Sequence, residues 1–272
     1  MNLVQAFLLG IIQGLTEFIP VSSTAHLLIA QNLMGLNSNG QMFSFLVLVQ
    51  MGTILALLIY FWRDFWNIGR AVMVGVIKRQ PLHNLEARLG WLVLIATLPA
   101  LATGFLLKDF VQSMFENALT QAGVRLLMSA ALLAGVEFFG RHTRTFESAT
   151  WVDALAVGLF QVLSLFPGAS RSGSTIAGGI ARGFDRPSAA RFAFLMSAPI
   201  LLAAGIYETI KAIELPGTHE FLPILLTGFI SAAVVGWLAI RWLMSFLNRH
   251  SLYVFAIYCL VTGSLCFIPA IL

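Results

Sequence analysis

Charged side chains are scarce in this sequence of 272 residues. Only 10% of the residues are Asp, Glu, Lys or Arg, whereas 58% are hydrophobic and the mean hydropathy is +0.87. A soluble globular domain carries roughly 25% charged residues, so this chain has too few to cover a surface that faces water. The composition therefore predicts an integral membrane protein.

Other absences narrow the class further. The two cysteines, Cys259 and Cys266, are seven residues apart; on one helix that spacing is about 10 Å along the axis, too far for a disulfide. The first five residues contain no Lys or Arg, so we expect no cleavable export signal. The sequence has neither a Gly-x-x-x-x-Gly-Lys loop nor a His/Cys ligand cluster, which argues against an ATP-driven pump and a zinc site. The net charge of +4 comes from segments beside apolar stretches, so it does not indicate a nucleic-acid partner.

Six apolar stretches are long enough to cross roughly 30 Å of hydrocarbon as helices. Two further segments, 2–35 and 153–184, are apolar but interrupted near the middle by proline and serine. We therefore expect an all-α polytopic membrane protein in which residues 1–272 form a single membrane domain. The six predicted transmembrane helices cover about residues 43–62, 89–107, 123–139, 192–210, 221–240 and 253–270.

The two interrupted segments predict re-entrant helical hairpins. Their arms are about 10 to 18 residues long, which is short for a span and suits a half-helix. Non-helical backbone at membrane depth is tolerated only where protein or a wet cavity satisfies its polar groups. The polar tips of both hairpins should therefore be buried inside the protein. The alternative is that the interruptions are ordinary loops between true spanning helices.

The two predicted hairpins also resemble each other in sequence. Gly10-x-x-Gln13 in the first is matched by Gly158-x-x-Gln161 in the second, and each pattern is followed by a proline and a serine-rich tip. Three predicted spans follow each hairpin, and an odd number of crossings brings the second half in from the opposite face. We therefore predict an inverted-topology repeat, with a site near the midplane where the halves meet. The predicted repeats are residues 1–147 and 148–272.

The basic residues provide an independent argument for this topology. Under it, 12 of the 16 Lys and Arg residues lie on one face, 3 lie on the other, and Arg171 lies in a hairpin tip. By the positive-inside rule the first face is cytoplasmic. Both termini are then expected outside the cytoplasm. The residues assigned to the outer face are Lys108, Arg125 and Lys211.

The tip of the first hairpin combines a carboxylate, a histidine and several hydroxyls. Gln13 and Glu17 are four residues apart and share one helix face, and a carboxylate inside a membrane segment is by default a functional hypothesis. The N–H groups that begin the second arm suit an anion such as phosphate. His26 follows Ser23 by three residues, close enough to exchange a proton with it; a structural pair of Glu17 with His26 is the alternative. The hydroxyls that can cap the second arm or bind a ligand are Ser22, Ser23 and Thr24.

The tip of the second hairpin adds a positive charge. Gly168 and Gly173 allow the backbone to approach a ligand closely. The planar fork of Arg171 matches two phosphate oxygens. A structural pair of Arg171 with Glu17 is the alternative, and the two roles can coexist. The hydroxyls of this tip are Ser170, Ser172 and Thr175.

Residues 13–26 (QGLTEFIPVSSTAH) and 167–175 (PGASRSGST) resemble two motifs of the bacterial undecaprenyl-pyrophosphate phosphatase family, which is linked to bacitracin resistance. The resemblance covers the whole chain in length and segment order. Re-entrant hairpins in an inverted repeat are also features of that family, and the resemblance implies a location in a bacterial inner membrane. This chain differs at Gln13, where the family motif often begins with a carboxylate, and at Ala25, where glycine is common.

The resemblance implies a role for each residue of the two tips. Ser23 would be the nucleophile or a primary phosphate contact, and His26 the acid/base. Arg171 would clamp the pyrophosphate. Glu17 would hold a divalent cation, Mg²⁺ or Ca²⁺, or orient the attacking group. The remaining substrate-binding residues would be Gln13, Ser22, Thr24, Ser170, Ser172 and Thr175.

The implied activity is the hydrolysis of undecaprenyl or another polyprenyl pyrophosphate to the monophosphate and inorganic phosphate. That reaction recycles the lipid carrier of cell-wall peptidoglycan synthesis. The expected partners are the lipid substrate and the surrounding membrane lipid, with no nucleic acid, and a homodimer is compatible with the sequence. The alternative is a polyprenyl-phosphate flippase or transporter that uses the same pocket, because inverted repeats with broken helices are typical of alternating access.

Overall fold

A computed structural model describes residues 1–36, 40–106, 118–165, 169–213 and 218–268. Within these ranges the regular structure is helical, apart from one isolated bridge between Arg144 and Phe184. This agrees with the predicted all-α fold. The helices are α1 (Leu3–Phe18), α2 (Ser23–Leu33), α3 (Gly40–Tyr60), α4 (Trp62–Ile77), α5 (Leu85–Leu106), α7 (Ala118–Phe139), α8 (Trp151–Val162), α9 (Arg171–Ala181), α10 (Arg186–Ile213), α11 (Thr218–Leu247) and α12 (Tyr253–Leu265), with short 3₁₀ turns at Phe146–Ser148 and Leu163–Leu165.

Four helical stretches in the described residues are long and apolar enough to cross a membrane. A fifth span is obtained if the bent pair Ser44–Tyr60 and Trp62–Ile77 is counted as one, with a bend of 76° between its parts. The protein is therefore a multi-pass membrane protein. Tyr253–Leu265, which falls in the sixth predicted stretch, is a shorter apolar helix. The four long stretches are Leu85–Gly104, Ala118–Phe139, Arg186–Tyr207 and Phe221–Leu247.

Helix α4 has no counterpart among the predicted spans. It carries Arg63 and Arg70, which interrupt the run of hydrophobic residues on which those predictions depend. Large apolar side chains on its surface, including Trp62, Trp66 and Ile77, are nevertheless exposed. A helix with exposed aromatic and basic residues fits the boundary between hydrocarbon and head groups.

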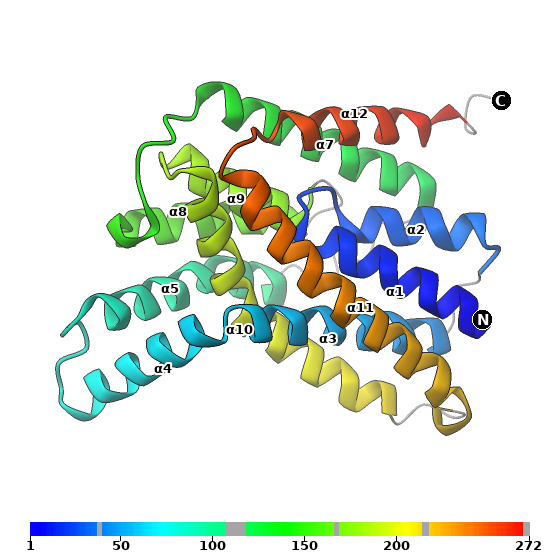
Figure 1. Ribbon diagram of the computed structural model, residues 1–272, viewed down its shortest axis with the longest axis horizontal. Helices are drawn as coiled ribbons and strands as arrows, with labels where there is room; N and C mark the ends of the chain where they lie inside the picture. The colour runs from blue at the N-terminus through cyan, green and yellow to red at the C-terminus, as the bar shows by residue number, and fades with distance from the viewer. Residues whose placement is uncertain (37–39, 107–117, 166–168, 214–217, 269–272) are drawn as a thin grey trace.

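Each predicted hairpin is a pair of short helices, α1 with α2 and α8 with α9. These helices have 16, 11, 12 and 11 residues, or about 17 to 24 Å each, less than the roughly 30 Å of hydrocarbon. Helix α1 ends at Phe18 because Ile19 is extended, with φ −64° and ψ 133°, as the residue before a proline commonly is. In Figure 1 the open ends of the two pairs lie on opposite sides of the molecule and their tips approach its centre.

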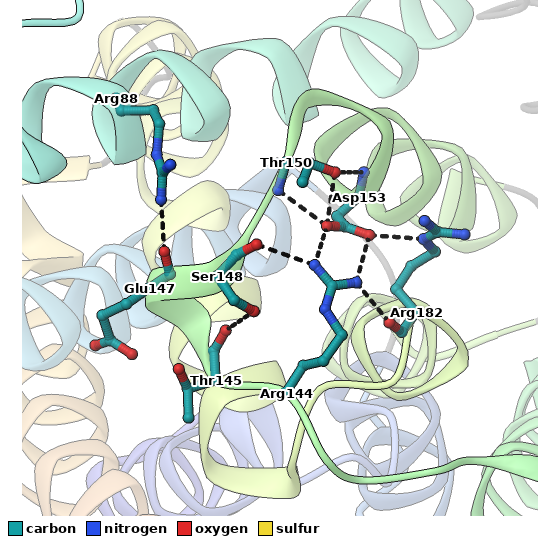
Figure 2. Close-up of polar contacts among 8 residues, drawn as sticks. All are labelled: Arg88, Arg144, Thr145, Glu147, Ser148, Thr150, Asp153 and Arg182. Atoms are coloured by element: carbon teal, nitrogen blue, oxygen red, sulfur yellow. Dashed lines mark hydrogen bonds and ion pairs between the residues drawn. The ribbon is translucent and has the colours of Figure 1, made fainter.

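A buried carboxylate closes the open end of the second pair (Figure 2). Asp153, in the first turn of α8, has a fully buried side chain. Its oxygens accept hydrogen bonds from Arg144 (2.7 and 3.1 Å), from Arg182 after the end of α9 (2.7 Å), and from the N–H and hydroxyl of Thr150 (2.9 and 2.8 Å). Burial alone would raise the pKa of Asp153, but these bonds outweigh it and hold the pKa well below the usual range. Asp153 therefore fastens the start of α8 to the end of α9.

The glycines of the two matched patterns occupy equivalent close contacts. In α1, a Cβ on Gly10 would lie 2.6 Å from the carbonyl oxygen of Gly228 in α11. In α8, a Cβ on Gly158 would lie 2.5 Å from the carbonyl oxygen of Ala96 in α5. Any other residue would force these helices apart, because small residues are what lets membrane helices approach closely. Each hairpin thus packs through its glycine against a long helix of the other half of the chain.

Asp153→Asn is expected to lower the free energy of unfolding by about 3 kcal/mol, because Arg144 and Arg182 lose their shared carboxylate. The measurement is thermal unfolding in detergent, and Glu86→Gln, at an exposed carboxylate of α5, is the control. A carboxyl group with a lowered pKa stabilises the fold fully above its unfolded pKa of about 3.9 and loses this effect as the pH falls further. The difference between the wild type and Asp153→Asn should therefore persist at pH 7 and shrink below about pH 4. Equal stability at pH 7 would contradict the role of Asp153.

Candidate active site

The tips of the two hairpins meet inside the protein. Arg171, the first residue of α9, forms an ion pair with Glu17 in the last turn of α1. Beside this pair, the Ser172 hydroxyl donates to the carbonyl of Ile19 at 3.4 Å. The structure thus joins residues that are 154 positions apart in sequence. The pair of Arg171 with Glu17, which the sequence analysis gave as an alternative, is therefore formed.

A cavity of about 400 Å³ opens at this junction. One wall is the first tip, a second is the second tip, and α3, α5, α7 and α10 contribute the remainder. Thr175 and His26 do not line the cavity; the Thr175 hydroxyl donates to the Arg171 carbonyl (2.9 Å). Pro167 and Gly168 of the second motif lie outside the described residues. The polar residues of the wall are Gln13, Glu17, Ser22, Ser23, Thr24, Gln31, Gln50, Arg125, Gln161, Ser164, Ser170, Arg171 and Ser172.

Glu17 is the centre of the polar contacts in this cavity. Its Oε2 accepts hydrogen bonds from the Ser23 hydroxyl (2.6 Å) and the Gln13 amide (2.9 Å), and its Oε1 accepts from Arg171. Only 4% of its side chain is exposed. Three donors, one of them a cation, therefore satisfy this buried side chain. The Ser23 hydroxyl thus has a carboxyl group within hydrogen-bonding distance, that of Glu17.

The expected exchange between Ser23 and His26 is not formed in the structure. The His26 ring is stacked on Tyr258 of α12, with its Nε2 2.7 Å from the Tyr258 hydroxyl, and its Nδ1 is 2.9 Å from the carbonyl oxygen of Ser22. A carbonyl only accepts, so Nδ1 carries the hydrogen, and Nε2 of the neutral ring accepts from the tyrosine. Sequence spacing missed this arrangement because Tyr258 is 232 residues away along the chain. The alternative pair of Glu17 with His26 is likewise not formed: in the part of the chain that the structure describes, Glu17 bonds to Gln13, Ser23 and Arg171, and His26 to Ser22 and Tyr258.

Ser22 holds the first tip in an unusual backbone conformation. Its φ of 68° is uncommon for a residue with a side chain. Such conformations cost about 1–3 kcal/mol and cluster at functional sites. The Ser22 side chain caps α2 by accepting from the Ala25 N–H (3.5 Å), and its carbonyl is held by His26. His26 thus supports the strained turn that presents Ser23 to Glu17.

The start of α9 faces the same cavity as the start of α2. Ser170 caps α9 by accepting from the Gly173 N–H (3.2 Å), and its own N–H donates to Ser129 of α7 (3.0 Å). Two helix N-termini therefore point at one polar cavity. Their unpaired N–H groups and positive dipole ends favour an anion between them.

The structure adds cavity and tip residues that sequence analysis did not place at the site, among them Gln161, Ser129 and Arg125. Gln161, the repeat mate of Gln13, lines the cavity and is 2% exposed. The amide oxygens of both glutamines are buried without a hydrogen-bond partner. Ser129 supports the second tip. Arg125, which the charge count assigned to the outer face, is a buried residue of the cavity wall. Lys108 and the side chain of Lys211 lie outside the described part. The available signal was that Arg125 falls within the predicted span 123–139.

Ser129→Ala is expected to lower the free energy of unfolding by about 1–3 kcal/mol, because the Ser170 N–H would lose its acceptor in a buried position. The matched control is Ser264→Ala. Ser264 makes the same kind of bond to the carbonyl four residues earlier, but it is exposed. Thermal unfolding of both variants in detergent measures the difference. Equal effects of the two substitutions would show that Ser129 does not support the tip.

Comparison with known proteins agrees with this arrangement. The family model described as bacitracin resistance protein BacA matches residues 6–265. A protein of Chlorobium phaeovibrioides named undecaprenyl-diphosphatase is 41% identical, over 97% of this chain and 96% of its own length. Proteins of the same name from Thermomicrobium roseum and Myxococcus xanthus are 41% and 40% identical, over 97% of this chain and 96% and 88% of their own lengths. The chain therefore belongs to the bacitracin resistance protein BacA family.

Proposed function

We propose that the chain is an undecaprenyl-diphosphatase, which hydrolyses undecaprenyl or another polyprenyl pyrophosphate to the monophosphate and inorganic phosphate. The observation that carries this proposal is the contact of Ser23 and Arg171 with one buried carboxylate, Glu17, between two helix N-termini. The names of the relatives at about 40% identity support the same reaction. Such an enzyme recycles the lipid carrier of cell-wall synthesis and thereby contributes to bacitracin resistance.

The cavity has the chemistry that a lipid pyrophosphate requires. Arg171 and the two helix N-termini supply positive charge and N–H donors for phosphate oxygens. The hydroxyls of Thr24, Ser170 and Ser172 line the same space. Apolar side chains complete the wall, so a prenyl chain can continue from the polar centre into lipid. These apolar residues include Leu27, Leu28, Leu46 and Ile200.

Ser23 is the proposed nucleophile and Glu17 the proposed base. As the Ser23 oxygen attacks the terminal phosphorus, its proton passes to Glu17, to which it is already bonded at 2.6 Å. The bond from that phosphorus to the bridging oxygen breaks, and the polyprenyl monophosphate leaves. Water then hydrolyses the phosphoserine, releases inorganic phosphate and restores Ser23. The competing scheme is direct attack on the phosphorus by water that Glu17 orients.

In this proposal Arg171 exchanges its partner Glu17 for the substrate when the substrate binds. Without substrate it pairs with Glu17. A pyrophosphate offers the guanidinium two oxygens in a bidentate geometry and so competes for it. Transfer of Arg171 to the phosphate would leave Glu17 free to accept the Ser23 proton. Substrate binding and activation of the base are thereby coupled.

A divalent cation, Mg²⁺ or Ca²⁺, fits one corner of the cavity. Among the described residues no group of three His, Cys, Asp or Glu side chains is present. However, Glu17 and the unpartnered amide oxygen of Gln13 are adjacent oxygen donors, and Mg²⁺ is commonly held by one or two carboxylates with substrate phosphates. Glu17 and Gln13 are the residues that would hold the ion. When bound, it would neutralise charge on the phosphate oxygens.

We propose that the protein lies in the bacterial inner membrane with the topology expected from the sequence. In this topology the chain has six spans and two re-entrant hairpins in an inverted repeat, and both termini lie outside the cytoplasm. The short hairpin helices and the equivalent contacts of Gly10 and Gly158 support it.

Purified protein in detergent is expected to release phosphate from a polyprenyl pyrophosphate without any membrane gradient. Arg171→Ala should lower kcat/KM by about 10²–10³-fold, because a positioned donor to the developing charge is lost. Arg249→Ala, at an exposed arginine, is the matched control. Phosphate release by Arg171→Ala at the wild-type rate would overturn the site. Movement of lipid phosphate across vesicles without phosphate release would instead favour a transporter, the alternative that the comparisons do not support.

Ser23→Ala separates the two chemical schemes in the same assay. Loss of activity in Ser23→Ala, together with a phosphoserine trapped at Ser23 by acid quenching of the wild type, is the expected result. Full activity in Ser23→Ala would establish attack by water. A metal chelator added to the wild type measures the contribution of the cation.

His26 is expected to position the tip rather than to transfer a proton. Asn can present an amide N–H to the Ser22 carbonyl much as His Nδ1 does, but it has no titratable nitrogen. His26→Asn should therefore keep kcat within about tenfold of the wild type, while His26→Ala should lose more. If His26 is the general acid or base, both variants should lose the roughly 10²–10⁴-fold that such catalysis provides.

A further inference from the structure

Arg125 is a second guanidinium in the cavity, on a different helix from Arg171. It lies in α7 and is 8% exposed. A charged side chain within a membrane helix is costly and is usually retained for a function. Arg125 lies in the wall of the cavity where an anion is expected, so the function indicated is anion binding.

The helix face that carries Arg125 is in contact with the second tip. Ser129, four residues later on the same face, accepts a hydrogen bond from the Ser170 N–H (3.0 Å) and donates one to the Arg125 carbonyl (2.7 Å). Arg125 belongs to α7 and Arg171 to the start of α9, so the two arginines reach the cavity wall from different elements.

The charges that line the cavity favour a diphosphate. Among the described residues that line the cavity, Glu17 is the one carboxylate, and it pairs with Arg171. Arg125 adds a second positive charge to the same wall. A monophosphate can satisfy one guanidinium in a bidentate manner, whereas a diphosphate has oxygens for two.

From this we infer that Arg125 binds the second phosphate of a diphosphate and makes the cavity select diphosphates over monophosphates. The inference rests on the proposed function and adds a specificity residue to it. Arg171 holds one phosphate beside Ser23 and Glu17, and Arg125 holds the other. After cleavage of the bond between the phosphates, neither product spans both arginines. Each product is then held less tightly than the substrate, which assists its release.

Binding of two soluble probes tests this selectivity without relying on turnover. The probes are methylenediphosphonate, a non-hydrolysable diphosphate analogue, and inorganic phosphate, both titrated calorimetrically into the full-length protein in detergent. The wild type should bind methylenediphosphonate more tightly. Arg125→Gln should weaken that binding by roughly 10- to 100-fold, the effect of a lost charged hydrogen bond, and change phosphate binding by less than about threefold. Arg70→Gln, at an exposed arginine of α4, is the matched control and should change neither.

Other outcomes separate the inference from the proposed function. If Arg125→Gln weakens the binding of both probes equally, or weakens the binding of neither, the role of Arg125 is overturned. If Arg125→Gln does not fold, Arg125→Lys decides the question, because it keeps the charge and loses the fork. Arg125→Lys should weaken the binding of methylenediphosphonate by several-fold more than the binding of phosphate. An equal effect on the two probes would overturn the inference. A wild type that prefers methylenediphosphonate but hydrolyses no polyprenyl pyrophosphate would contradict the proposed function alone.

Discussion

The ion pair between Glu17 and Arg171 is the interaction on which the site depends. It joins the tips of two hairpins that come from opposite halves of the chain. In an apolar surrounding, either charge alone would be strongly disfavoured, and the pair is tolerable because each charge is hydrogen-bonded. Gln13 and Ser23 complete the coordination of the carboxylate. The same contacts that make burial of Glu17 acceptable also place a hydroxyl nucleophile against a base.

The rest of the fold keeps these two tips in register. Asp153 fastens the open end of the second hairpin, while Gly10 and Gly158 let each hairpin lie directly against a long helix. Ser129 holds the second tip against α7. These contacts are far apart in the chain, and none of them contains a reacting group. They determine where the two helix N-termini point, and therefore where an anion is stabilised.

The first tip combines strain with support. Ser22 has a positive φ, and the neighbouring His26 is anchored on one side by the Ser22 carbonyl and on the other by Tyr258. Functional sites often keep such conformations because the surrounding structure over-determines them. In this protein the strained residue directly precedes Ser23. The ring of His26 thus has a physical task even though it does not touch the cavity.

The sequence by itself determined that this is a membrane protein, because so few charged residues cannot cover a surface that faces water. It also determined where the helices break, since Pro20 and the serine-rich tips interrupt apolar segments too short to span. The polar residue types at those breaks indicated an anion site. The helix α4 was missed because its arginines interrupt the hydropathy signal, although its aromatic residues suit an interface.

Only the tertiary structure decided which residues contact one another. Spacing along the chain suggested that Ser23 would use His26, but the turn at Ser22 directs Ser23 to Glu17 and His26 to Tyr258. Local sequence also placed Arg125 at a membrane surface, whereas packing of α7 against the second tip buries it in the cavity. The reason is physical: a one-dimensional pattern reports how polar a segment is, while the partner of a buried polar group depends on segments that may lie more than a hundred residues away.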